Sequence, residues 1–353
     1  MKNRQIGLIL VLGALAFAAG CGGKSSAPQA PAPAESQPAQ VTISKPPSSF
    51  RIGLLLPGPV NDGGWNASAY EGLAEIKAKY NCETSYQESV PPSNYEEIFR
   101  TYASQGYDIV FGHGYEFGDA AIKVAAEFPQ VKFCVTSTEI SAAPNVSSMR
   151  NNYQEMGYLM GVVAATMSKT RTVGALGGMD IPSISDALWA FEAGVKATDP
   201  DIRVFSVMTG SFEDVAKAKE STLSMIEQGA DIVFHDADQS GFGVFEACKE
   251  QGVLALGAIA DQGEIAPDTI LTSGICTVAA GMRAVVDLII EGTWEPRAYL
   301  MGAAQDAVAV APFRQFDSQV PQSLKDTLAK LLADMKSGAF NATAVVDAYK
   351  SSK

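Results

Sequence analysis

QGYDIVFGHG at residues 105–114 and QGADIVFHDAD at residues 228–238 share a Gln-Gly-x-Asp-Ile-Val-Phe core, offset by 123 residues. In each copy a glycine turn precedes a short apolar run, which is typical of a buried strand. The sequences before the two copies match as well, because each half starts with an apolar, glycine-bearing run that a loop and a helical pattern follow. The repeat therefore predicts one structural unit used twice.

Each copy of the unit reads as βαβαβ and continues through one more helix to one more strand. We expect first strands at 50–57 and 171–179, helices after them at about 66–80 and 183–197, and final strands at 133–136 and 253–259. Strands that alternate with helices form parallel sheets covered on both faces and joined by right-handed crossovers. The pattern predicts an α/β protein with two Rossmann-like lobes.

The loops after the strands are expected to form the binding site. Ligands of parallel α/β sheets bind at the carboxyl edge, and two such sheets that face each other make a cleft. The loops that would line this cleft follow Pro57, Phe111, Val135, Gly178, Phe234 and Ile259. Two further apolar stripes predict helices of ordinary length, one at 154–168 and one that ends near Gly338.

The amino terminus has the pattern of a bacterial lipoprotein signal. A basic start is followed by an apolar run at 6–19, too short to cross a bilayer, and small residues then precede Cys21. We expect residues 1–20 to be a signal peptide and Cys21 to become the lipidated first residue; the alternative is an ordinary signal peptide cut nearby. Residues 21–49, rich in proline and alanine, are expected to form a disordered tether.

Composition and cysteine spacing exclude several classes of protein. The formal net charge is −13, and such an acidic body argues against a nucleic-acid partner. The cysteines after the signal are far apart and form no C-x-x-C pair, so buried thiols are expected, with a disulfide as the alternative. They are Cys82, Cys134, Cys248 and Cys276.

The two histidines of the chain, His113 and His235, both follow the repeated strands. With Asp236, Asp238 and Asp261 they could suggest a metal site, but the ligand spacing of known metal motifs is absent. We therefore expect no metal and no cofactor. Hydrogen bonding to a polar ligand or support of the loops is the expected role of these histidines.

The first loop, PVNDGGWNASAYEG at 59–72, favours binding over catalysis. The chain has no G-x-S-x-G elbow, no H-E-x-x-H and no phosphate loop, so we expect no catalytic residues and no enzyme. Asp62, Asn66 and Trp65 instead offer an acceptor, an amide and a flat ring, which suit a planar ligand with hydrogen-bonding edges. Packing of Trp65 over the first helix is the alternative.

Four segments carry a resemblance to a known family. They are LLLPGPVNDGGWNASAYEGL at 54–73, KVAAEFPQVKF at 123–133, GGMDIP at 177–182 and GVFEACKEQG at 243–252. Together they resemble the basic membrane protein family, the purine nucleoside receptor-like lipoproteins of ABC importers, over about residues 50 to 315.

The resemblance implies a type I periplasmic binding protein fold, in which two lobes close by a hinge on a ligand in the cleft between them. It implies an N-terminal lobe of residues 50–150 plus 277–305 and a C-terminal lobe of residues 151–276 plus 306–350. The strands that join the lobes would cross near Arg150–Tyr153, Cys276–Val278 and Gly302–Ala309. The expected partners are a purine-like small molecule and ABC permease subunits, with a monomeric receptor held at the cell envelope only by its lipid anchor.

Loop position and resemblance together give the expected ligand-binding residues. In the first half these are Asp62, Trp65, Asn66, Tyr70, His113, Tyr115, Phe117 and Ser137. In the second half they are Asp180, His235, Asp238, Phe242 and Asp261.

Two positions depart from the family pattern. Nucleoside-binding relatives commonly place an acid and a lysine where this chain has Ile259 and Cys276, and the acid holds the ribose hydroxyls. Their loss favours a free purine base or a similarly compact heterocycle over a nucleoside. His235, Asp236 and Asp238 could instead reach the hydroxyls, so a nucleoside receptor stays open, as do a receptor for sugars or other solutes and a sensor on the same fold.

Overall fold

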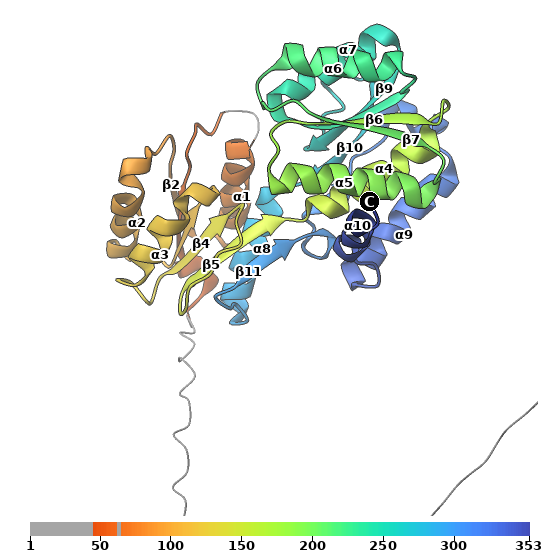
Figure 1. Ribbon diagram of the computed structural model, residues 1–353. Coiled ribbons are helices and arrows are strands. Elements are labelled where there is room, and N and C mark those ends of the chain that lie inside the picture. The colour runs from red at the N-terminus through yellow and green to blue at the C-terminus, as the bar shows by residue number, and fades with distance from the viewer. Residues whose placement is uncertain (1–44, 62–64) are drawn as a thin grey trace, which may run out of the picture. The chain divides into compact units, whose positions relative to one another are not determined.

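Two six-stranded sheets, each covered by helices on both faces, make up the protein (Figure 1). The computed structural model describes residues 45–61 and 65–353, which all belong to one compact unit. The expected signal peptide, the lipidated Cys21 and most of the expected tether lie outside the described residues. In the part of the chain that the structure describes, no helix is long and apolar enough to cross a membrane.

The first sheet has the strand order β11-β5-β4-β3-β1-β2, and every neighbouring pair is parallel. Its strands are β1 (Arg51–Leu55), β2 (Glu83–Gln87), β3 (Ile109–Gly112), β4 (Lys132–Thr136), β5 (Val146–Asn151) and β11 (Ala298–Met301). The first copy of the DIVF repeat is β3, at the centre of this sheet, where a continuous apolar run is buried on both faces.

The second sheet repeats the arrangement in the order β12-β10-β9-β8-β6-β7, with β12 as its one antiparallel strand. Its strands are β6 (Thr172–Gly177), β7 (Arg203–Met208), β8 (Ile232–Asp236), β9 (Leu254–Ile259), β10 (Ile270–Cys276) and β12 (Val308–Val310). The second DIVF copy is β8, in the position that β3 has in the first sheet. The predicted repeat and the two-lobed α/β fold are therefore confirmed.

The helices form layers on the two faces of each sheet, and a hydrophobic core fills each interface. On the first sheet α1 (Trp65–Tyr80) and α8 (Val278–Glu291) cover one face, and α2 (Tyr95–Ser104) and α3 (Gly118–Ala125) cover the other. On the second, α4 (Tyr153–Met167), α5 (Pro182–Thr198), α9 (Gln322–Ser337) and α10 (Ala342–Ser351) cover one face, and α6 (Val215–Glu227) and α7 (Gly241–Gln251) the other. The predicted helix end at Gly338 is confirmed, since Gly338 caps α9 with a φ of 77°.

Close packing against α5 buries α4 on nearly every side, which the amphipathic pattern of its sequence did not predict. A Cβ atom on Gly157 would lie 2.2 Å from the carbonyl oxygen of Ala187, and one on Gly161 would lie 2.1 Å from that of Phe191. Glycine is needed at both positions because the backbones of the two helices approach each other directly.

The chain passes between the sheets three times, after β5, after β10 and after β11, and hydrogen bonds tie these crossings together. Asn151 Nδ2 donates to the Cys276 carbonyl (2.8 Å), the Asn152 N–H to the Met301 carbonyl (2.7 Å) and the Thr277 N–H to the Ala307 carbonyl (2.9 Å). The crossing strands are thus bonded to one another rather than exposed separately to solvent, as buried backbone groups require.

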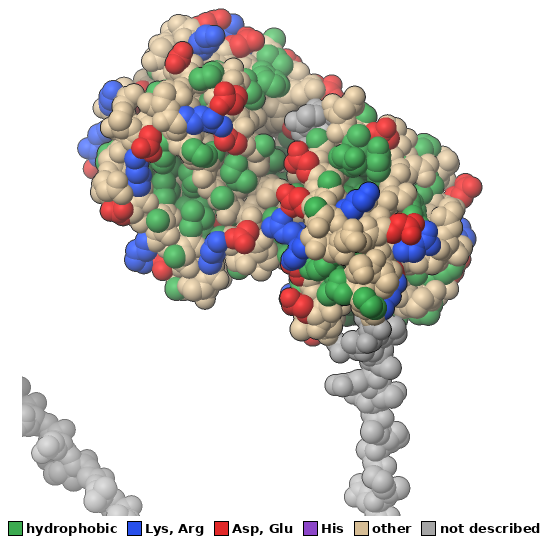
Figure 2. Space-filling model, turned by 180° about the vertical axis from the view of Figure 1, so that it is seen from behind, with side chains coloured by type: hydrophobic (Ala, Val, Ile, Leu, Met, Phe, Trp, Pro, Cys, Tyr) green, Lys and Arg blue, Asp and Glu red, His purple; other side chains and the backbone are tan. Residues whose placement is uncertain are grey.

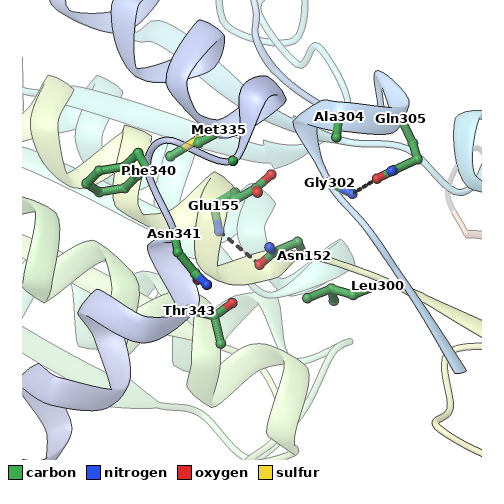
Figure 3. A pocket seen from close by; sticks show the side chains of 11 residues that line it. Asn152, Glu155, Leu300, Gly302, Ala304, Gln305, Met335, Phe340, Asn341 and Thr343 are labelled. Atoms are coloured by element: carbon green, nitrogen blue, oxygen red, sulfur yellow. Dashed lines mark hydrogen bonds between the residues drawn. The ribbon is translucent and has the colours of Figure 1, made fainter.

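Glu155, in the first turn of α4, ties the first crossing to the third. Its carboxylate accepts the Ala303 N–H, in the short helix η5 (Ala303–Gln305), at 2.7 Å. Burial raises the pKa of this carboxyl group, and the bonds from Ala303 and Asn152 oppose that rise. Glu155 also lines a pocket of about 380 Å³ between the crossings and the end of α9, with Met335, Phe340 and the other residues in Figure 3.

We predict that Glu155→Ala destabilises the protein by about 1 to 3 kcal/mol, because the buried Ala303 N–H loses a charged acceptor. Glu155→Gln is the matched control, since its side-chain oxygen still accepts this bond, and it should lose clearly less. Equilibrium urea unfolding measures both. Equal losses for the two variants would show that the bond to Ala303 does not stabilise the crossings.

Candidate functional site

A histidine and a tryptophan form the centre of the first sheet's carboxyl edge. His113 follows β3, is fully buried, and has its ring centroid 3.7 Å from that of Trp65 at an interplanar angle of 32°. His113 Nε2 lies 3.1 Å from the Trp65 carbonyl oxygen, and Nδ1 lies 2.9 Å from Thr136 Oγ1. The Gly114 N–H donates to the same hydroxyl at 3.0 Å.

These contacts fit one neutral tautomer of His113. A carbonyl oxygen only accepts, so Nε2 carries the proton toward Trp65. Nδ1 then accepts from the hydroxyl of Thr136, which itself accepts from Gly114. His113 therefore contacts one face of the Trp65 ring and ties the start of α1 to β3, and the half-buried Trp65 ring also packs against the core of the first lobe. Thr136 was missed by the sequence analysis, although its place at the end of a predicted strand was a usable signal.

Asn66 and Tyr70 lie near Trp65 on α1, whereas Asp62 is outside the described residues. Asn66 is buried and its Oδ1 accepts the Gly58 N–H at 3.3 Å. Tyr70 is partly exposed and meets the Tyr86 ring edge-on at 4.9 Å. The Asn66 side chain thus stabilises the first loop, and the Tyr70 ring packs against Tyr86 with part of its surface exposed.

The other first-half residues differ in accessibility. Tyr115 is 74% exposed. Ser137 is exposed just after β4, with a φ of 60°, and its N–H donates to the Met149 carbonyl at 2.7 Å. Phe117 is fully buried in the core and stacks on Tyr95 at 3.9 Å between ring centroids. We therefore leave Phe117 out of the proposed ligand contacts.

Asp236 is the buried acid at the second sheet's carboxyl edge. It ends β8 opposite Gly177 of β6 and is 3% exposed. Among the described residues, no hydrogen bond reaches its Oδ2. Burial raises the pKa of Asp236 to about 8, and the nearby charge of Asp238 adds to the rise.

Two neutral groups from other elements lie near Asp236. Burial raises the pKa of Tyr153, at the start of α4, and of Cys276, at the end of β10, and the charge of Asp236 contributes to both shifts. From the sequence, Asp236 was a possible metal ligand and an alternative ribose contact, because its burial could not be predicted from the chain.

His235 supports a loop rather than facing the edge. It is 1% exposed, and its Nε2 donates to Gln262 Oε1 at 3.1 Å, an oxygen that also accepts the Ala258 N–H at 3.0 Å. Burial lowers the pKa of His235 to about 4, so the ring is neutral at physiological pH. Its Nδ1 faces the backbone of Gly241, where a Cβ would lie 2.3 Å away.

Ile259, the residue that replaces the expected acid, has a strained backbone. Its φ is 72°, a rare value for a β-branched residue, and the Ala260 N–H donates to the Ala258 carbonyl at 2.8 Å. This bond between residues two apart closes a γ-turn around Ile259. Strain of this kind costs about 1 to 3 kcal/mol and is concentrated at functional sites.

The remaining predicted residues of the second half follow strands of the second sheet, Asp180 and Asp261 in loops, Asp238 in a short helix and Phe242 at the start of α7. Asp180 accepts the Ser185 hydroxyl at 2.6 Å, and Asp261 forms an ion pair with Arg314 at 2.8 Å. Asp238 is exposed at the start of the short helix η4 (Asp238–Ser240), and Phe242 is 43% exposed. Asp180 and Asp261 therefore have structural partners, which their positions in the sequence did not indicate.

Phe212 is an aromatic that the sequence analysis missed. It lies between β7 and α6, half-buried, with its ring directly over Gly178, where a Cβ would lie 2.3 Å from Cδ1. Gly178 follows β6, and its N–H donates to the Asp236 carbonyl at 3.0 Å. Phe212 thus places a flat ring at the carboxyl edge of the second sheet, and its position in a loop after a predicted strand was the available signal.

Among the described residues there is neither a candidate metal cluster nor a disulfide. No group of three His, Cys, Asp or Glu side chains there could hold a metal ion. The expected buried thiols are confirmed, since all four cysteines after the signal are free and buried: Cys82, Cys134, Cys248 and Cys276. Figure 2 shows basic and acidic side chains interspersed over one face of the molecule, a pattern that does not resemble the basic stripe of a nucleic-acid-binding protein.

Comparison with known proteins gives one family. The family model Bmp, described as ABC transporter substrate-binding protein PnrA-like, matches residues 50–340. In fold, the chain is similar to an ABC transporter system solute-binding protein from Conexibacter woesei DSM 14684, with a TM-score of 0.68 and 23% identity, over 83% of this chain and 98% of that one.

Three curated relatives carry different names. The chain is 28% identical to the transcriptional activator protein med of Bacillus subtilis (strain 168), over 80% of this chain and 87% of that protein. It is 27% identical to a purine-binding protein of Brucella abortus (strain 2308), over 83% and 82% of the two chains. It is 31% identical to the ABC transporter nucleoside-binding protein BmpA of Lactococcus lactis subsp. cremoris (strain MG1363), over 70% and 69%.

Proposed function

We infer that this chain, which belongs to the Bmp family of PnrA-like ABC transporter substrate-binding proteins, binds a purine base or a similarly compact planar heterocycle. Proteins of this class act outside the cytoplasm and deliver small molecules to permease subunits, so the chain is an extracytoplasmic substrate-binding protein. We propose in addition that the ligand is a free base rather than a nucleoside, that Cys21 carries a lipid anchor and that the protein is a monomer.

The ring pair of Trp65 and His113 is the observation that carries the proposal. A half-buried indole at a carboxyl edge, supported from behind by a buried imidazole, is a rigid platform for a flat ligand. Phe212 offers a second flat ring at the edge of the other sheet. The name of the Brucella relative agrees with a purine ligand.

Two residues at the ends of strands favour binding of a free base over binding of a nucleoside. The family resemblance assigns Ile259 and the fully buried Cys276 to positions where nucleoside-binding members carry an acid and a lysine. Ribose hydroxyls that leave water without partners cost about 1 to 3 kcal/mol each. Nucleoside binding is the second candidate function, because the Lactococcus relative is named for nucleoside binding.

Trp65→Ala should weaken purine-base binding by about tenfold to a hundredfold, since stacking of one base on an aromatic contributes about 1 to 3 kcal/mol. Trp189→Ala is the matched control, because Trp189 lies within α5 against Tyr349, with 6.4 Å between ring centroids. Calorimetric titration and thermal melting separate binding from folding. Unchanged affinity in a folded Trp65→Ala protein would remove Trp65 from the site.

Competition titration should rank adenine, guanine, hypoxanthine and xanthine each above its own nucleoside, by about tenfold for one unsatisfied hydroxyl. Ile259→Asp is the matched variant, because it restores an acid at a positive φ that aspartate tolerates better than isoleucine. It should raise nucleoside affinity relative to base affinity. A nucleoside that binds the native chain more tightly than its own base would refute the preference.

We also propose that the lobes close on the ligand by bending at the three crossings, because these are the connections between the two sheets. Closure should reduce the radius of gyration measured by small-angle X-ray scattering when a saturating purine base is added. Trp65→Ala at the same ligand concentration should show a smaller change. Superimposable profiles of the native chain with and without a bound base would contradict hinged closure.

A further inference from the structure

Among the described residues, Asp236 is a buried carboxyl group at the second carboxyl edge whose Oδ2 has no hydrogen-bond partner. Of the buried side-chain atoms without a partner in the described chain, three lie near this edge: Asn151 Oδ1, His235 Nδ1 and Asp236 Oδ2. The Asn151 side chain bonds to the Cys276 carbonyl in the crossings. The His235 ring packs against Gly241, where a Cβ would lie 2.3 Å from Nδ1. A buried polar atom without a partner costs about 1 to 3 kcal/mol, so a carboxyl group kept in this state indicates a partner that arrives later.

The surroundings keep this carboxyl group neutral near neutral pH. Tyr153 of α4 and Cys276 of β10 lie close enough for the charge of Asp236 to add to the rise of their pKa values, which burial raises well above the ordinary range. Asp238, from the adjoining short helix, adds a negative charge. A neutral carboxyl group presents one O–H donor beside one carbonyl acceptor.

We propose that the carboxyl group of Asp236 recognises the ligand by this paired donor and acceptor, and that it selects a purine with an exocyclic N–H beside a ring nitrogen, as in adenine. The carbonyl oxygen accepts the amino N–H while the carboxyl O–H donates to the ring nitrogen, so the unpartnered Oδ2 gains a hydrogen bond. The inference rests on the proposed function, since it assigns an edge to the base that Trp65 stacks. Asp236 is thus a specificity-determining residue of the same site.

The test compares adenine with unsubstituted purine, which keeps the ring system but lacks the amino group. The native chain should bind adenine at least about tenfold more tightly than purine, because purine leaves the carbonyl acceptor unpaired. Asp236→Leu should bind the two with similar affinity, since stacking remains and edge recognition is lost. Asp236→Asn, whose amide also offers a donor beside an acceptor, should keep the preference for adenine.

The pH profile gives a second readout. Adenine affinity of the native chain should be constant below the pKa of about 8 and fall toward tenfold per pH unit above it, because the ionised carboxylate cannot donate. Asp236→Asn should show no such fall. His235 stays neutral over this range, since burial lowers its pKa to about 4.

Stability gives a third readout that needs no ligand. The pKa of Asp236 is raised from 3.8 in the unfolded chain to about 8 in the folded one, so the folded state binds the extra proton between these values. Native stability should therefore decline as pH rises from about 4 to about 8 and level off above that. Asp236→Asn should lack this decline and melt at a higher temperature than the native chain above pH 8.

Two outcomes would overturn the inference. If purines bind but the adenine-to-purine affinity ratio is the same in the native chain and in folded Asp236→Leu, Asp236 does not recognise the hydrogen-bonding groups of the base. The proposed function would still stand. If no purine base binds the native chain at any pH, the proposed function and this inference fail together.

Discussion

Hydrogen bonds tie the three crossing strands to one another where the chain passes between the two sheets. The chain must leave one sheet and enter the other three times, and buried backbone groups at each passage need partners. The crossings supply most of these partners themselves, and the carboxylate of Glu155 supplies one for Ala303. Because the crossings begin at the ends of β5 and β10, this network also fixes the carboxyl edges where the candidate site lies.

The two histidines have the same structural role in the two copies of the repeat, whereas the residues beside them differ in role. His113 and His235 both follow the central repeated strand, and both are buried and bonded to protein groups. The first supports the ring of Trp65, and the second holds the loop of Gln262. The residues that the histidines support or adjoin, the ring of Trp65 on one lobe and the carboxyl group of Asp236 on the other, are the ones we propose to contact the ligand.

The sequence predicted the strands, the repeat and the edge, because apolar runs and glycine turns are local signals. It could not predict side-chain direction in the loops, which distant contacts decide. Phe117 turns into the core against Tyr95, and Asp261 pairs with Arg314, 53 residues later in the chain. The γ-turn at Ile259 and the burial of Asp236 likewise depend on neighbouring strands, so the edge was predictable and the chemistry of its residues only in part.

We propose that an aromatic edge on one lobe and a neutral carboxyl group on the other hold a free purine base. Mass spectrometry of small molecules released by denaturing the purified protein tests this directly, since tightly bound solutes persist through purification. We expect an ultraviolet-absorbing molecule with the mass of a purine base, present at up to one per chain and depleted in Trp65→Ala. Release of an intact nucleoside, or of a sugar without a heterocycle, would contradict it.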